Sequence, residues 1–129
     1  MTNECSADEI EGLRAVPVFS ELEPKVIGQI LDVAERRHIG SGALLIQRGD
    51  PAADLFIVLG GRFAVLGPSG PIAEISVGEP IGELAFFAGG VRSADVIALR
   101  DSEVLVISQA GYREVAQQVA GLERSILSS

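Results

Sequence analysis

Between residues 36 and 107 the chain is divided into short apolar segments, separated by glycine, proline or aspartate at intervals of roughly eight to twelve residues. The segments are rich in branched side chains, which favour extended backbone. We expect strands at 36–39, 43–47, 55–59, 62–66, 72–77, 93–98 and 104–107. Many short strands with such punctuation are typical of antiparallel barrels and jelly rolls. The sequence therefore predicts a mainly β fold, an eight-stranded antiparallel jelly-roll barrel over 36–108.

Glycines mark the two sharpest turns of this β region. Gly60 and Gly61 separate the third and fourth expected strands, and Gly67 and Gly70 flank Pro68-Ser69 before the fifth. Glycine permits the positive φ angles that tight hairpins require. We therefore expect tight turns at both places.

Helices are expected before the β region, over 6–35. Ser6 and Glu9 form a capping box, which predicts a short helix that ends near Pro17. A second helix begins at Pro24, because proline suits the first helical position. Its apolar residues recur at helical spacing and should pack on the β region; they are Val26, Ile27, Ile30, Leu31 and Ala34.

The helical pattern returns over 109–129, where apolar residues are spaced four, three and four positions apart; they are Val115, Val119, Leu122 and Ile126. This is the spacing of a short a/d seam. Two interpretations are open: an intramolecular lid, and a parallel homodimer, which we favour. Gly121 interrupts the seam and weakens the helix by about 1 kcal/mol relative to alanine.

The composition excludes several classes of function. The 129 residues suit one domain, expected to span 1–129, and the apolar runs are far shorter than a membrane span of roughly 20 residues. The formal net charge of −8 opposes contact with nucleic-acid phosphates, so we expect no nucleic-acid partner. With one cysteine and one histidine, we expect neither a metal centre, a cofactor nor a catalytic site. Residues 1–10 do not resemble a secretory signal, so a cytoplasmic location is expected.

One segment, residues 78–94, breaks the strand pattern and carries Arg92 as its single cation. A short helix entered through Gly82 would direct unpaired backbone N–H groups at an anion. The Gly89-Gly90 turn can bring Arg92 back onto that anion, where a planar guanidinium suits a phosphate. Glu83 accepts hydrogen bonds and can bind hydroxyl groups beside the phosphate. Together these residues match a sugar phosphate with a free 2′-hydroxyl.

This segment resembles the phosphate-binding cassette of the cyclic-nucleotide-binding domains in catabolite activator proteins, protein kinase A regulatory subunits and cyclic-nucleotide-gated channels. The resemblance runs from about residue 13 to residue 112 and is densest at 82–85 and 92–94. It implies a cyclic nucleotide ligand, cAMP or cGMP, of which we favour cAMP. It also implies that Arg92 clamps the cyclic phosphate and that Glu83 binds the ribose 2′-hydroxyl. The other pocket residues that it implies are Gly82, Leu84, Ala85, Ser93 and Ala94.

Some features depart from the family pattern. Ile81 stands where an aromatic residue is usual, and Val91 stands where many members have proline. On the spacing of activator-type relatives, the helix residues that contact the purine would lie beyond Ser129. A bland alternative for the cassette is an exposed ion pair between Arg92 and Glu83 with no ligand.

Three functions are compatible with these residues. The first is a sensor that relays cyclic nucleotide binding to an output element. The second is a ligand-free protein-interaction module of the same fold. The third is the regulatory fragment of a larger enzyme such as a bacterial patatin-like phospholipase, whose nucleotide domains the sequence also resembles.

Overall fold

A computed structural model describes residues 19–20 and 22–127 of the chain. Within them, eight strands form two four-stranded sheets, ordered β1-β8-β3-β6 and β2-β7-β4-β5, with every pairing antiparallel. The strands are β1 (Ala34–Ile39), β2 (Leu44–Ile46), β3 (Asp54–Gly60), β4 (Arg62–Gly67), β5 (Gly70–Ser76), β6 (Pro80–Ile81), β7 (Asp95–Ala98) and β8 (Ser102–Ser108). The predicted mainly β, antiparallel jelly roll is confirmed, although the pairings give two separate sheets in place of a closed barrel.

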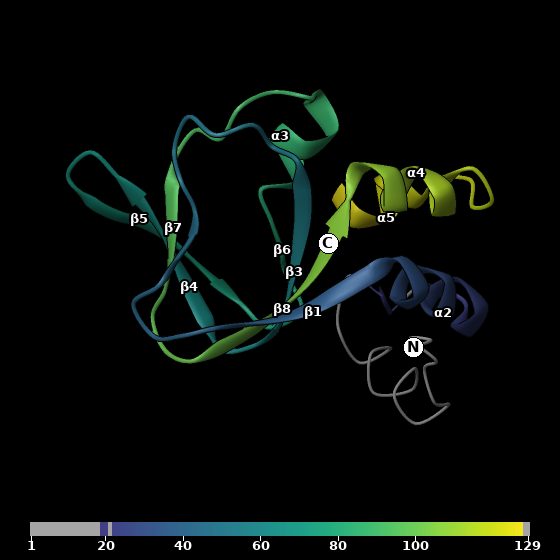
Figure 1. Ribbon diagram of the computed structural model, residues 1–129, viewed down its shortest axis with the longest axis horizontal. Coiled ribbons are helices and arrows are strands. Elements are labelled where there is room, and N and C mark those ends of the chain that lie inside the picture. Colours follow the sequence, from purple (N-terminus) through teal and green to yellow (C-terminus); the bar gives the residue numbers. More distant parts are fainter. Residues whose placement is uncertain (1–18, 21, 128–129) are drawn as a thin grey trace.

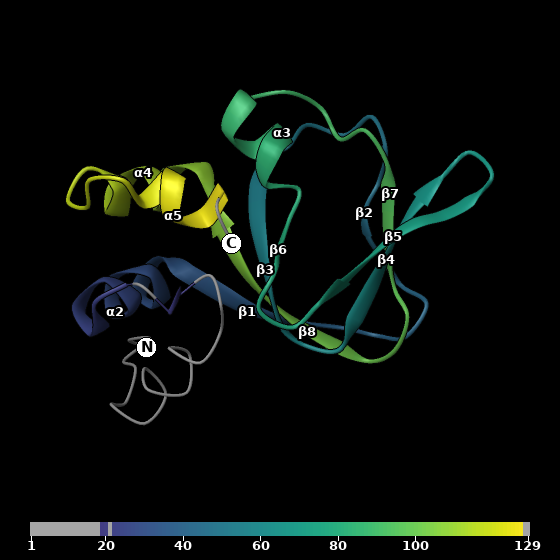
Figure 2. The same ribbon diagram turned by 180° about the vertical axis from the view of Figure 1, so that it is seen from behind.

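Four helices accompany the sheets in the described part of the chain: α2 (Pro24–Val33), α3 (Glu83–Ala88), α4 (Gln109–Ala116) and α5 (Leu122–Leu127). Figures 1 and 2 show α2, α4 and α5 gathered beside the sheet that contains β1, β3 and β8, with the β4–β5 hairpin projecting on the far side. The short helix α3 lies over one end of the sheets. The helix predicted between Ser6 and Pro17 lies outside the described residues.

Strand β3 is buried on both faces, which divides the apolar core in two. Leu55 and Ile57 face the helices and belong to a cluster that contains residues of α2, α4 and α5. Phe56 and Val58 point the other way, into a cluster between the two sheets. Because successive side chains of a strand alternate between faces, a strand covered on both sides is apolar at every position.

The two predicted turns are confirmed. Gly61 joins β3 to β4 with a φ of 88°, and Pro68-Ser69 joins β4 to β5, where Gly67 pairs with Gly70. Strand β6, only two residues long, is absent from the predicted set because such a length shows no alternation.

The prediction of one continuous C-terminal helix is wrong. The chain turns between α4 and α5, and Gly121 has a φ of 79° in the left-handed region. Val115, Leu122 and Ile126 are each at most 3% exposed in the same cluster as α2, and Val119 packs against it. Side chains buried in the chain's own core cannot form an exposed seam, so the surface through which we expected a homodimer is not there.

Candidate functional site

Helix α3 begins and ends at glycines in the left-handed conformation. Gly82, its N-cap, has φ 71° and Gly89, its C-cap, has φ 72°. Non-glycine residues pay for this conformation, so the two glycines limit the helix to six residues. Phe86 fixes α3 on the helical core, where its side chain is 1% exposed.

The backbone of the cassette is joined to the loop that precedes β3. The Arg92 N–H donates to the Asp50 carbonyl at 2.8 Å, and the Gly49 N–H donates to the Arg92 carbonyl at 2.9 Å. The Ala52 N–H donates to the Gly90 carbonyl at 3.1 Å. These bonds fix the position from which the Arg92 side chain leaves the backbone.

Arg92 is the one charged side chain that is buried among the described residues, with 5% exposure. Its Nη1 donates to the Gly82 carbonyl at 2.8 Å, and its Nη2 donates to the Asp54 carbonyl at the start of β3. The guanidinium carbon lies 5.7 Å from the centre of the Phe56 ring, within the range of a cation–π contact. Burial lowers the pKa of Arg92, and the negative charge of Asp54 opposes this shift. An arginine remains protonated under such conditions, so the site keeps a positive charge.

The structure brings all the predicted site residues together around one cavity of about 330 Å³. They are Gly82, Glu83, Leu84, Ala85, Arg92, Ser93 and Ala94. This volume is within the range of roughly 300 to 1,000 Å³ that is usual for small-molecule sites. The opposite wall comes from the strands and consists of Ile46, Val65, Ala73, Ile75, Pro80, Ile81 and Val96.

Glu83 lines this cavity and is half-buried. Among the described residues its carboxylate has no ion-pair or hydrogen-bond partner, and in particular it does not pair with Arg92. The alternative of an exposed ion pair between Arg92 and Glu83 is therefore wrong. The carboxylate oxygens are free to accept hydrogen bonds from a molecule in the cavity.

Arg92 also lines a second, smaller cavity of about 180 Å³. Half of its lining residues are polar, among them Arg37, Asp50 and Asp54. The guanidinium thus forms part of the wall between two spaces, with the apolar cavity and Glu83 on one side. It can change its hydrogen-bond partners without entering a packed part of the core.

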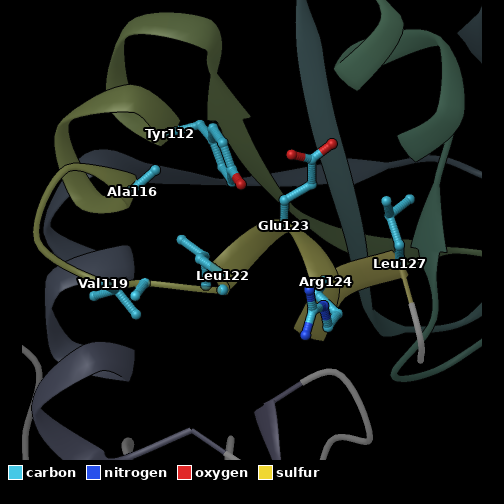
Figure 3. A pocket seen from close by; sticks show the side chains of 9 residues that line it. Tyr112, Ala116, Val119, Leu122, Glu123, Arg124 and Leu127 are labelled. Carbon is cyan, nitrogen blue, oxygen red and sulfur yellow. The ribbon is translucent and has the colours of Figure 1, made fainter.

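A larger cavity of about 710 Å³ lies between α4 and α5, away from the cassette (Figure 3). Its cation, Arg124, is adjacent in the chain to Glu123, whose charge disfavours an anion there. Figure 3 shows Tyr112 on α4 directed toward α5, where Glu123 lies. The larger volume therefore does not make this cavity the better candidate. In the smaller cassette cavity the cation, Arg92, has no acidic neighbour in the chain, which suits a phosphate better.

Three aromatic rings connect the cassette helix to α4. Phe86 and Phe87 of α3 lie 5.6 Å and 5.1 Å from the Tyr112 ring, and 5.2 Å from each other, in edge-to-face arrangements. The Gln109 side chain of α4 also donates to the Phe86 carbonyl at 2.9 Å. A displacement of α3 would therefore move or repack α4, because the two helices are in direct contact.

Several residues of the site were not predicted. Asp54 holds Arg92 through a main-chain carbonyl, which every residue has, so no sequence signal marks it. The apolar wall residues Val65, Ala73 and Ile75 belong to the β4–β5 hairpin, where the sequence indicates a strand pair and nothing more. Phe56 could have been found as an inward-facing aromatic next to the loop that positions Arg92.

Two further observations concern the described residues as a whole. No helix among them is both long and apolar enough to cross a membrane. No group of three or more histidine, cysteine, aspartate or glutamate side chains among them is arranged to hold a metal ion.

The fold and this site define a class of protein: a jelly roll that presents a buried arginine and a free carboxylate in one cavity. The profile of the family described as Cyclic nucleotide-binding domain matches residues 36–119. The chain belongs to the cyclic nucleotide-binding domain family.

Named relatives come from several kinds of protein. An uncharacterized NTE family protein of Mycobacterium tuberculosis is 33% identical over 93% of this chain, and this chain covers 21% of it. A cAMP-dependent protein kinase regulatory subunit of Hypocrea atroviridis is 29% identical over 87% of this chain and is covered to 24%. The chain thus spans about a fifth to a quarter of the length of these curated relatives.

Solved structures share the fold. The Thermus thermophilus catabolite activator protein superposes with a TM-score of 0.77 at 24% identity, covering 87% of this chain and 55% of that one. The regulatory domain of Toxoplasma gondii PKA with cAMP gives a TM-score of 0.77 at 20% identity, covering 92% of this chain and 46% of that one. At these identities the likeness establishes the architecture alone.

Proposed function

We propose that this chain binds a nucleoside 3′,5′-cyclic monophosphate, with cAMP preferred to cGMP as the candidate, in the cassette cavity, with Arg92 on the cyclic phosphate and Glu83 on the ribose 2′-hydroxyl. The observation that supports this most is the convergence of one buried guanidinium and one unpaired carboxylate on a single cavity. A cation for the phosphate and an acceptor for the hydroxyl are the two groups that a cyclic ribose phosphate requires. Ser93 can add its hydroxyl, and Gly82, Leu84, Ala85 and Ala94 complete the cassette side of the cavity.

The Arg92 guanidinium donates to two main-chain carbonyls, and a bound phosphate must be accommodated beside these bonds or in their place. A phosphate oxygen carries more negative charge than a carbonyl oxygen, and a charge-assisted hydrogen bond contributes about 1.5 to 3 kcal/mol. Arg92 has further N–H donors beyond the two that reach Gly82 and Asp54. The phosphate therefore competes with, or adds to, the bonds that already hold the side chain.

The role proposed for binding is regulatory. A phosphate drawn onto Arg92 pulls on Gly82 and the start of α3, and α3 contacts α4 through Phe86, Phe87 and Tyr112. Binding would thus shift the population of α4 and α5 arrangements and so signal to an output element. We assign the chain no catalytic step of its own.

The test is calorimetric titration of the chain with cAMP and with cGMP, with 5′-AMP as the comparison ligand. We name cAMP as the first ligand because solved structures of the same fold contain it, the Toxoplasma gondii PKA regulatory domain among them. A cyclic nucleotide should bind at least about tenfold more tightly than 5′-AMP, a difference of about 1.4 kcal/mol. Absence of binding by both cyclic nucleotides would leave the ligand-free interaction module as the better interpretation.

The second candidate is that this binding unit regulates an enzyme in a longer chain. The similarity to an NTE family protein, which extends over 93% of this chain, supports it. The gene sequence beyond codon 129 tests this directly. An enzymatic domain in the same reading frame would favour the candidate, and a DNA-binding or channel domain would exclude it.

A further inference from the structure

Resting on the proposed function, we propose that the cassette cavity takes up the base by apolar contact alone, so that it accepts purine and pyrimidine cyclic nucleotides with similar affinity. The ligand class is then any ribonucleoside 3′,5′-cyclic monophosphate. The inference depends on how polar and apolar side chains are distributed around the cavity.

The polar side chains of the cavity come from one segment. Glu83 is the first residue of α3, and Arg92 and Ser93 follow that helix. With the phosphate on Arg92 and the sugar on Glu83, these side chains are used for the sugar phosphate. Ser93 follows Arg92 in the chain and lines the same cavity, and we assign its hydroxyl to the phosphate as part of this proposal.

The wall left for the base is hydrocarbon. Strands β2, β4, β5 and β7 contribute Ile46, Val65, Ala73, Ile75 and Val96 to it. Val65 and Ala73 are paired across the β4–β5 ladder, so they form one continuous apolar surface. None of these described side chains can donate or accept a hydrogen bond at the edge of a base.

Leu84 adds to this surface from the side of α3. It lines the cavity and is 72% exposed, so its apolar surface is open to contact with a ligand. A flat ring laid against it removes apolar surface from water at about 25 cal/mol per Å². Every base has two apolar faces, so this contribution favours binding whichever base is present.

Strong discrimination between bases requires polar groups that one base satisfies and another leaves unpaired. A hydrocarbon wall separates ligands mainly by size, and a base edge left in solvent keeps its hydrogen bonds to water. The larger purine ring should therefore bind somewhat better than the pyrimidine ring. The identity of the exocyclic groups should matter little.

The experiment is to measure dissociation constants of the full 129-residue chain for cAMP, cGMP, cCMP and cUMP by calorimetry. We expect cAMP and cGMP to agree within about threefold and all four ligands to lie within about tenfold of one another. A preference of about a hundredfold or more for one ligand would overturn the inference while leaving the proposed function supported. If none of the four binds, the proposed function fails and the inference with it.

A variant separates phosphate contact from base contact. Ser93→Ala should weaken the binding of all four ligands by the same factor, because we assign its hydroxyl to the phosphate that all four share. Ser69→Ala, in the exposed turn between β4 and β5 and outside the cavity lining, is the matched control and should change none of them. A change of about tenfold or more in the ratio of two ligands in Ser93→Ala would show that this side chain reads the base, against the inference.

Discussion

The guanidinium of Arg92 occupies the space that a side chain at position 82 would need. A Cβ atom placed on Gly82 would lie 2.1 Å from Nη1 of Arg92, far inside van der Waals contact. The same Nη1 donates to the Gly82 carbonyl at 2.8 Å. Glycine at this position therefore does two things: it permits the left-handed start of α3, and it lets the arginine lie against the backbone.

Gly82→Ala should weaken cAMP binding at least about tenfold, because the new methyl group must displace the guanidinium from the cavity wall. Gly89→Ala is the matched control at the other end of α3. It has the same left-handed conformation, with φ 72° against 71°, but a Cβ there meets nothing within 4 Å. Each variant should lose about 1 to 2 kcal/mol of unfolding free energy from backbone strain. Equal loss of affinity in both variants would show that strain, and not the arginine, is responsible.

Arg92 is part of the core as well as of the site, which the sequence does not reveal. From its position in the cassette one expects Arg92→Ala to weaken binding at least about tenfold without touching the core. The structure corrects this, because the side chain is 5% exposed, lies over Phe56 and holds two carbonyl groups. Removing it leaves buried acceptors unpaired, at a cost of about 1 to 3 kcal/mol.

Arg92→Lys is consequently the more informative substitution. The ammonium keeps the charge but cannot reach two carbonyls and a phosphate with a planar fork, so affinity for cAMP should fall at least about tenfold. Urea unfolding should show a smaller loss of stability than in Arg92→Ala. Arg62→Lys, which affects an exposed ion pair with Glu74, is the control and should change stability by less than about 1 kcal/mol. Unchanged affinity in Arg92→Lys would mean that the phosphate lies elsewhere.

The proposed contact between Glu83 and the ribose is tested by a double-mutant cycle. Glu83→Ala and the ligand 2′-deoxy-cAMP each remove one partner of the same hydrogen bond, and each should weaken binding about tenfold. When the two changes are combined, the loss of affinity should be hardly larger than for either alone, because the second change removes a contact already lost. Glu114→Ala on the exposed face of α4 should leave the affinity for both ligands unchanged. Fully additive effects in the cycle would place the 2′-hydroxyl away from Glu83.

The strand pattern could be predicted because it depends on local rules. Branched residues between glycine turns indicate strands, and β3, β4 and β5 begin and end within two residues of their predicted bounds. The C-terminal region could not be predicted in this way. The spacing of the apolar residues between Val115 and Ile126 defines an apolar face but does not say which part of the chain covers it. The left-handed turn at Gly121 folds that face back onto α2.

The charged part of the site was predictable for a chemical reason. An arginine and a glutamate in a glycine-rich segment that interrupts the strands, together with the resemblance to the family's cassette, point to these two residues, and the structure places both on one cavity. The apolar half was not predictable, since Val65 and Ala73 differ in no way from other strand residues until the fold brings β4 and β5 to the same cavity as the cassette. The main-chain contact between Arg92 and Asp54 is likewise a property of the fold and not of residue type.

Tyr112 offers a pH measurement that reports on the contact between α4 and α5. It is the single tyrosine of a chain without tryptophan, so tyrosinate absorbance arises from this residue alone. Burial, and to a lesser degree the charge of Glu123, raises the pKa of Tyr112 from 10.0 to about 12. The folded state thus favours the neutral phenol.

The unfolded chain ionises this phenol near its ordinary pKa of 10, which sets the sign of the pH dependence. The stability contributed by the neutral form is complete below pH 10 and is lost as the pH rises from 10 to about 12. Absorbance titration of the folded chain should give a midpoint near 12, and titration in urea should give one near 10. Glu123→Gln should lower the folded midpoint partway, because burial remains. A folded midpoint near 10 would mean that Tyr112 is not buried in solution.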